Sequence, residues 1–218
     1  MKRFFFVAIS LFALCASAQQ FKQTGTDIDD VKPQGWMHSA VMGDINGDGR
    51  IDMVAVCTPN DSTKITKRED GFCDNFNQPV LVVYVAGADG KQHLFRKYDT
   101  ILPARVDESI DVTTIPSITK KGNIVLEVST FASMGSWTTT STKYVFRYQN
   151  DDIYCIGKDC ASVARNTGER EVVSENYLTA KQLTTTSNDV KKKKAKKVWK
   201  NLQKKALQKL GEFNLENN

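Results

Sequence analysis

The chain has 218 residues and a formal net charge of +5, a length that fits one domain with a single core plus an appendage. The charge is uneven, because residues 191–218 carry ten Lys against two Glu while residues 19–190 hold 18 basic and 23 acidic side chains. The positive net charge therefore comes from the C-terminal tail. Residues 19–190 are mildly acidic, so the chain is not a uniformly basic domain.

The first residues predict export. Lys2 and Arg3 precede an apolar run over residues 4–14, and Ala16-Ser17-Ala18 has the small-x-small pattern of a signal-peptidase site. We expect residues 1–18 to be a signal peptide and the protein to be periplasmic or secreted. The run is too short for a membrane span, which needs about 20 residues. A lipoprotein anchored at Cys15 is the less favoured alternative, since Leu14 stands where a small residue is needed.

Residues 19–35 are polar and contain Gly25, Pro33 and Gly35, which predicts a flexible lead-in before a β-domain at residues 36–186. Stretches rich in β-branched and aromatic residues predict strands near residues 37–43, 51–57, 80–86, 92–98, 110–115 and 123–131. The sequence therefore predicts a mainly β (α+β) class with one compact antiparallel sheet domain.

A hairpin is expected next, because residues 138–148 and 152–157 flank the turn sequence QND. Tyr144, Phe146 and Tyr148 share one face of its first arm, which we expect to face the core. The earlier segment 59–78 is polar and lacks periodicity. It is expected to be a long loop, either a solvated insertion or a surface for a partner.

The sharpest chemical pattern lies in GDINGDGRIDMVAVC, residues 43–57. Asp44, Asn46 and Asp48 alternate along a glycine-containing turn, Arg50 can offer its backbone carbonyl, and Asp52 follows. Oxygen donors at this spacing are typical of a calcium loop, and carboxylates so close together repel one another unless they are neutralised. A polar hairpin chosen for turn geometry alone is the alternative.

The pattern is not an EF-hand, because Ala55 stands where that motif needs a bidentate Glu. Residues 43–52 with the apolar strand after them resemble the calcium loop of FG-GAP/VCBS-like (integrin-type) repeats. The resemblance implies a Ca²⁺ site with side-chain ligands Asp44, Asn46, Asp48 and Asp52 and the carbonyl of Arg50. A complete propeller is not expected, since only one such loop is present. The wider order over residues 36–160 is similar to small exported bacterial proteins that carry one such loop and have no assigned activity.

Four cysteines remain after the signal: Cys57, Cys73, Cys155 and Cys160. An even count in an oxidising compartment predicts disulfides. Of the three pairings, we favour Cys57 with Cys73 and Cys155 with Cys160. Zinc is the weaker alternative, because the spacings form no paired Cys-x-x-Cys hooks.

Residues 187–218 predict a Lys-rich amphipathic helix, since apolar residues recur every four positions after Ser187-Asn188-Asp189: Val198, Leu202, Ala206 and Leu210. Such a helix is expected to dock on the β-domain, and contact with an anionic membrane surface is the alternative. No nucleic-acid partner is expected, because the lysine-rich part of the tail, residues 191–209, has no Arg and one aromatic residue, Trp199.

Catalytic signals are weak. The two histidines, His38 and His93, lie near no recognisable nucleophile motif. The sequence thus favours a non-enzymatic, exported calcium-binding module for an envelope or extracellular macromolecule. The alternative is a small secreted hydrolase, with glycans as the candidate substrate class, a structural Ca²⁺ and a carboxylate acid/base pair for which Asp107, Glu108, Asp111 and Glu127 are examples of available residues.

Overall fold

The structure is a computed structural model that describes residues 20–188, 190–191 and 193–215, without the side chain of Lys193. The expected signal peptide, residues 1–18, lies outside these ranges. The elements are β1 (Thr24–Gly25), α1 (Ile28–Val31), β2 (Met37–Gly43), β3 (Asp52–Thr58), η1 (Ser62–Lys64), β4 (Ile65–Lys67), β5 (Cys73–Asn75), β6 (Val80–Ala86), β7 (Gln92–Tyr98), β8 (Ile110–Ile118), β9 (Ile124–Ala132), β10 (Thr138–Gln149), β11 (Asp152–Ala164), β12 (Glu169–Asn176), β13 (Lys181–Asn188), β14 (Lys193–Asn201) and η2 (Leu210–Glu212).

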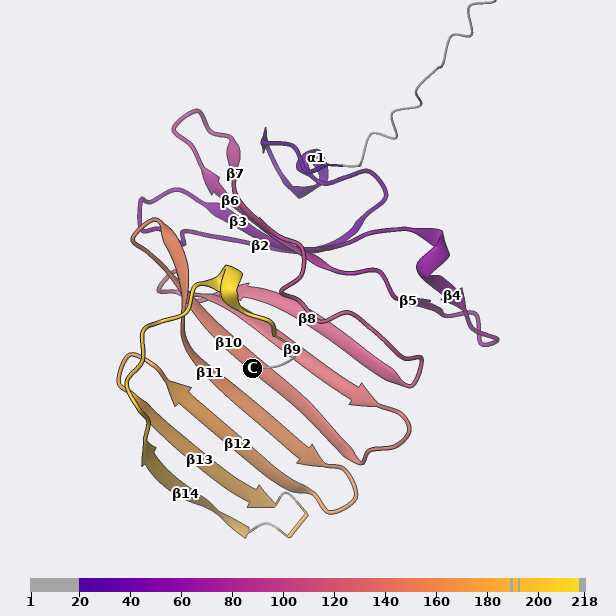
Figure 1. Ribbon diagram of the computed structural model, residues 1–218, viewed down its shortest axis with the longest axis vertical. Helices are drawn as coiled ribbons and strands as arrows, with labels where there is room; N and C mark the ends of the chain where they lie inside the picture. Colours follow the sequence, from indigo (N-terminus) through magenta and orange to yellow (C-terminus); the bar gives the residue numbers. More distant parts are fainter. Residues whose placement is uncertain (1–19, 189, 192, 216–218) are drawn as a thin grey trace, which may run out of the picture.

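The strands form two main antiparallel sheets (Figure 1). The small sheet has the order β1-β7-β6-β3-β2, and the large sheet is a seven-stranded meander from β8 to β14. Strands β4 and β5 form a separate short ribbon. The prediction of a mainly β, antiparallel fold is therefore confirmed. The strands expected near residues 37–43, 80–86 and 92–98 begin and end as predicted.

The main core lies between the small sheet and the β8–β11 half of the large sheet. Val54, Val56, Leu81 and Val83 come from the small sheet, and they share this core with the large-sheet residues Ile124, Leu126, Tyr144 and Phe146. Tyr144 and Phe146 are buried and Tyr148 packs at the margin, so the core face predicted for this strand is confirmed.

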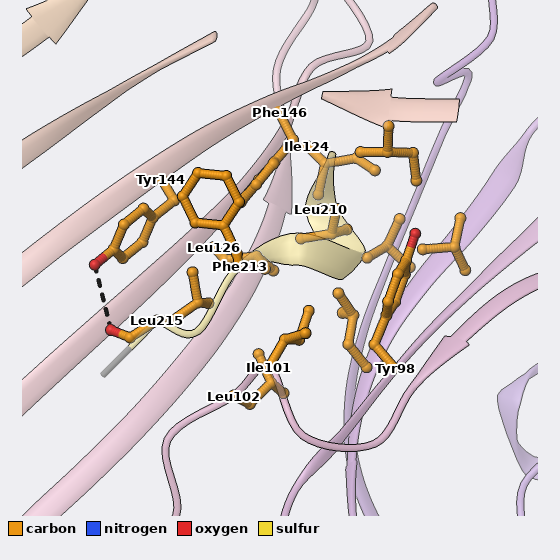
Figure 2. Close-up of a cluster of buried hydrophobic side chains, with 14 of the residues drawn as sticks. Tyr98, Ile101, Leu102, Ile124, Leu126, Tyr144, Phe146, Leu210, Phe213 and Leu215 are labelled. Carbon is orange, nitrogen blue, oxygen red and sulfur yellow. Dashed lines mark hydrogen bonds between the residues drawn. The ribbon is translucent and has the colours of Figure 1, made fainter. Parts of the chain in front are cut away.

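The C-terminal stretch completes this core. Leu210, Phe213 and Leu215 are buried in it. Figure 2 shows Phe213 beside the rings of Tyr144 and Phe146, with centroid separations of 6.3 and 5.7 Å. The Tyr144 hydroxyl donates a hydrogen bond to the Leu215 carbonyl at 3.3 Å. Residues far apart in sequence thus close one apolar cluster.

The expectation of a flexible lead-in at residues 19–35 was wrong. Phe21, Ile28 and Val31 are buried against the second face of the small sheet, and α1 begins after Asp27, whose carboxylate accepts from the Asp30 N–H. Strand β3 explains this cover, because its first six residues are all buried. A sheet that is apolar on both faces needs a layer on each side.

The phenol of Tyr84 fixes this N-terminal cover to β6. Its ring is fully buried, and its hydroxyl donates to the Lys22 carbonyl at 2.8 Å. We predict that Tyr84→Phe lowers the free energy of unfolding by about 1 kcal/mol through loss of this bond. Urea unfolding measures the change. Tyr154→Phe is the matched control, because that hydroxyl has no protein hydrogen bond within the described part of the chain. Equal effects of the two substitutions would contradict the role of Tyr84.

The C-terminal amphipathic helix predicted for residues 187–218 is not formed. Residues 193–201 are the strand β14, residues 202–208 continue without regular structure, and the one-turn η2 is the helical element there. The sheet also continues through the expected domain boundary at residue 186, which falls inside β13. Pairing of β14 with β13 satisfies the backbone of a segment whose four-residue apolar spacing suggested a helix. No helix of the described residues is long and apolar enough to cross a membrane.

The segment after β14 returns over the sheet and is tied down at both ends. Leu202 N–H donates to the Ala180 carbonyl at 2.8 Å, and Cys155 N–H donates to the Gln208 carbonyl at 2.9 Å. The Lys209 ammonium then lies 2.9 Å from the Asp152 carboxylate. These contacts position η2 and Phe213 so that Leu210 and Phe213 pack in the core.

The Asp152–Lys209 pair makes this anchor sensitive to pH. Partial burial alone would raise the pKa of the Asp152 carboxyl, but hydrogen bonds from Lys209 and from the Ile153 N–H hold that pKa below its usual value. The stability it contributes is therefore present above the unfolded pKa of about 3.9, and is lost as the pH falls through the lower folded value. We predict that Asp152→Asn is destabilising at pH 7 and that the difference from the unsubstituted protein shrinks towards pH 2 in urea unfolding. A difference that does not change with pH would contradict this.

Candidate functional site

The predicted calcium loop connects β2 to β3 and lies where the two main sheets meet. Gly47 and Gly49 have φ of +80° and +81°, so the tight turn needs residues without a Cβ. The β8–β9 turn packs on the loop at Gly122, where an added Cβ would stand 2.5 Å from the Asp44 carbonyl oxygen. On the other side, Gln92 of β7 donates to the Ile51 carbonyl at 2.8 Å. The loop therefore touches both sheets.

The structure brings three of the predicted ligands together. The Asp44 carboxylate accepts from the N–H groups of Gly47 at 2.7 Å and Gly49 at 2.9 Å. The Asn46 amide oxygen accepts from Asp48 N–H, and its NH₂ donates to the Asp48 carboxylate, each at 3.0 Å. These bonds hold the side chains in place. Both Asp44 oxygens, Asn46 Oδ1 and Asp48 Oδ1 each accept one hydrogen bond and keep a further lone pair for a cation, whereas Asp48 Oδ2 accepts from both Asn46 and Arg50.

Arg50 contributes its side chain, a role that the sequence did not suggest. Its guanidinium lies 2.5 Å from Asp48, and its Nε donates to the Ala86 carbonyl at 2.8 Å. The Arg50 N–H also hydrogen-bonds to Asp48, and this bond is the main cause that lowers the pKa of the Asp48 carboxyl. A positive group thus already faces Asp48. A cation bound at Asp48 would compete with the Arg50 guanidinium for this carboxylate. The role of the Arg50 backbone carbonyl as a ligand stays a prediction.

Asp52 is the buried member of the predicted ligand set. It is fully buried, and its two carboxylate oxygens accept from Ile45 N–H at 2.9 Å and Ala86 N–H at 2.8 Å. Burial raises the pKa of this carboxyl in spite of the two hydrogen bonds. In this arrangement Asp52 joins the loop to the end of β6. The charges of Asp48 and Asp44 also act on this carboxyl and contribute to the rise of its pKa.

The donor set fits a hard cation in type. Asp44, Asn46 and Asp48 supply oxygen atoms only, which suits Ca²⁺. Across residues 20–188, 190–191 and 193–215, however, no three His, Cys, Asp or Glu side chains gather closely enough to hold a metal ion. Asp52 is fully buried, and Asn46, which contacts Asp48, contributes an amide oxygen and no carboxylate. The fit of the loop to a cation therefore depends on Asp44, Asn46 and Asp48.

The expected disulfides are not formed, since Cys57, Cys73, Cys155 and Cys160 are all free thiols. Cys155 and Cys160 lie on the extended strand β11, about 16 Å apart for five steps of roughly 3.3 Å per residue, whereas a disulfide needs Cα atoms within about 7 Å. Cys57 is buried in β3 and Cys73 is exposed on β5. Burial raises the pKa of the Cys57 thiol to about 12 and that of Cys155 to about 11, which keeps both protonated.

Segment 59–78 is ordered by η1, β4 and β5, and a buried carboxylate that the sequence did not single out fixes it. Asp74 is almost fully buried and lies 2.9 Å from the Arg105 guanidinium, which also contacts Asp111 at 2.7 Å. The ring of Phe76 lies under the same guanidinium. Strand β5 has only three residues, too few for a hydrophobic-polar alternation that would indicate from the sequence that Asp74 is buried. Arg105 thus fastens the segment to the approach to β8.

The carboxylates considered for hydrolysis are held in other contacts. Asp111 pairs with Arg105, Glu127 accepts from Ser141 at 2.8 Å, and Asp107 accepts from the Ser109 N–H and hydroxyl. Among the histidines, His93 lies 2.9 Å from Asp89 and His38 lies 3.9 Å from Asp29. These contacts give each named group a structural partner and define no acid/base pair.

A cavity of about 480 Å³ lies beneath the returning segment 202–208. Cys155, Tyr177 and Phe213 line it together with Glu175. The Glu175 carboxylate already accepts from the Tyr177 hydroxyl and from Gln182, both at 3.0 Å. The protonated thiol and the satisfied carboxylate supply no activated nucleophile here.

Comparison with known proteins does not place this chain in a family: no family model, no curated protein and no solved structure matches it.

Proposed function

We propose that the protein is a non-enzymatic, exported calcium-binding β-domain that binds a macromolecule at the cell envelope or outside the cell. The observation that carries the proposal is the loop of residues 44–52, where Asp44, Asn46 and Asp48 are already held together by backbone and side-chain hydrogen bonds. Because this loop touches both main sheets, a cation bound there would act as a structural staple.

The binding role is supported by the uncovered part of the large sheet. The buried hydrophobic side chains of the described residues include none between residues 157 and 209. Strands β12–β14 therefore contribute no hydrophobic side chain to the buried core, and Figure 1 shows them on the side of the large sheet away from the small sheet. A domain stabilised elsewhere can use such an extension to present backbone and side chains to a partner.

Calorimetric titration tests the calcium part of the proposal. We predict one Ca²⁺ site with a Kd on the order of 10⁻⁴ M, as in extracellular modules, and weaker Mg²⁺ binding because Mg²⁺ needs stricter geometry. The double substitution Asp44→Ala, Asp48→Ala is expected to abolish it. The double substitution Asp99→Ala, Glu108→Ala removes two exposed carboxylates outside the loop and is expected to leave it unchanged. Absence of calcium binding by the unsubstituted protein would contradict the proposal.

A further inference from the structure

Strand β14 is the free edge of the large sheet. Among the residues that the structure describes, β14 pairs with β13 alone, whereas the opposite edge strand β8 lies against β2 and β3. Figure 1 shows β14 at the end of the sheet farthest from the small sheet. The outer side of an edge strand presents unpaired N–H and C=O groups, which are a template for another strand.

Positive charge surrounds this edge. Residues 190–209 contain ten Lys and no Asp or Glu. The side chains of Lys194, Lys196, Lys197 and Lys200 are exposed, and none forms an ion pair within the described part of the chain. Two copies of β14 paired together would set lysines against lysines, so the edge disfavours self-association.

The register places these charges on both faces of the strand. Lys200 continues the row Tyr144–Lys158–Glu175–Gln182 on the core-side face, and Lys196 lies on the same face. Lys197 and Trp199 lie on the opposite face. A flat membrane surface could reach one face only. A neighbouring strand projects side chains to both faces and can reach all of them.

Apolar surface accompanies the charge. Trp199 is 67% exposed and Val198 is 49% exposed. Trp199 also borders a shallow hollow of about 380 Å³ that Val145 and Leu183 help to line. Lysines alone would protect an edge against aggregation, but an exposed tryptophan works against such protection. Exposed lysines together with an exposed tryptophan are typical of a strand edge that binds a partner.

We propose that β14 binds an acidic, extended segment of a protein partner by strand addition, with carboxylates of the partner opposite Lys196 and Lys200 and an apolar side chain against Trp199. This proposal names the partner class of the binding module proposed above and rests on it. Backbone hydrogen bonds would supply affinity, while the cross-strand Lys–carboxylate pairs would select acidic sequences.

The test uses the full chain and a capped peptide of alternating Glu and Val, as long as the 9 residues of β14. A second peptide keeps every Glu but replaces alternate Val by Pro, which removes N–H donors at the same charge. We expect the first peptide to bind with a Kd below about 1 mM and the second to bind at least about fivefold more weakly. Amide hydrogen exchange should become slower along β14 in the complex.

Charge reversal locates the surface. Lys196→Glu, Lys200→Glu is expected to weaken peptide binding at least about tenfold, whereas Lys120→Glu, Lys121→Glu in the exposed β8–β9 turn is expected to change it less than about twofold. Both variants should keep the unfolding transition of the unsubstituted protein, which verifies that they fold.

Several results would overturn the proposal: no peptide binding at 1 mM, equal binding of the proline peptide, or unchanged exchange along β14. Binding to vesicles of anionic phospholipid without peptide binding would also overturn it, in favour of lipid contact. Calcium binding is measured on the same samples. Intact calcium binding without peptide binding would reject strand addition alone, and the loss of calcium binding would reject the proposed function.

Discussion

Replacement of Phe213 by alanine is expected to lower the free energy of unfolding by about 3–5 kcal/mol, the usual loss for a buried aromatic residue. Phe213 is 7% exposed, and its ring meets both Tyr144 and Phe146 edge-on (Figure 2). The substitution also weakens the attachment of the whole C-terminal stretch, since Leu210 and Leu215 enter the same cluster.

Urea unfolding followed by circular dichroism measures this loss. Phe72→Ala is the matched control, because Phe72 is 66% exposed and its removal is expected to cost less than about 0.5 kcal/mol. If Phe213→Ala were as mild as the control, the C-terminal stretch would not be part of the core.

Replacement of Asp52 by alanine is the second large effect, with an expected loss of about 2–4 kcal/mol. Ile45 N–H and Ala86 N–H would both lose their acceptor, and Asp52 itself is fully buried. The ionised carboxylate pays a desolvation cost that its removal recovers, since burial raises its pKa. This recovery keeps the loss below the sum of two orphaned donors.

Asp52→Asn separates the two contributions. The amide retains an oxygen for one N–H but turns its NH₂ towards the other donor, so the expected loss lies between that of alanine and zero. Asp99→Ala, at an exposed carboxylate, is the control and should change stability by less than about 0.5 kcal/mol in the same urea experiment. A loss for Asp52→Ala no greater than for this control would show that Asp52 does not fasten the loop to β6.

Strands with one or two apolar faces could be predicted from the sequence. The limits of β2, β6 and β7 follow from runs of β-branched and aromatic residues between turns. Strands β12 and β13 could not, because they cover no core and carry polar residues such as Glu171 and Thr185 on both faces. In β14, pairing with β13 outweighs the helical preference that its lysines and four-residue apolar spacing indicate, and this pairing is a tertiary effect that the local sequence does not contain.

The candidate site was predictable only in its local part. The spacing of Asp44, Asn46 and Asp48 along one turn defines which side chains converge. The inward orientation of Asp52 depends on Ala86, 34 residues away, and the Arg50 side chain reaches the same residue. Local spacing carries no information about β6, so these two roles required the structure.

We propose that calcium binding by the loop of residues 44–52 stabilises the fold. Thermal unfolding in about 10 mM CaCl₂ and in EGTA tests it most directly: a Kd of 10⁻⁴ M corresponds to about 2.7 kcal/mol and a rise in Tm of about 5–10 °C. The rise should be absent in the Asp44→Ala, Asp48→Ala variant. An equal Tm in CaCl₂ and EGTA for the unsubstituted protein, or an equal rise in the variant, would contradict the claim.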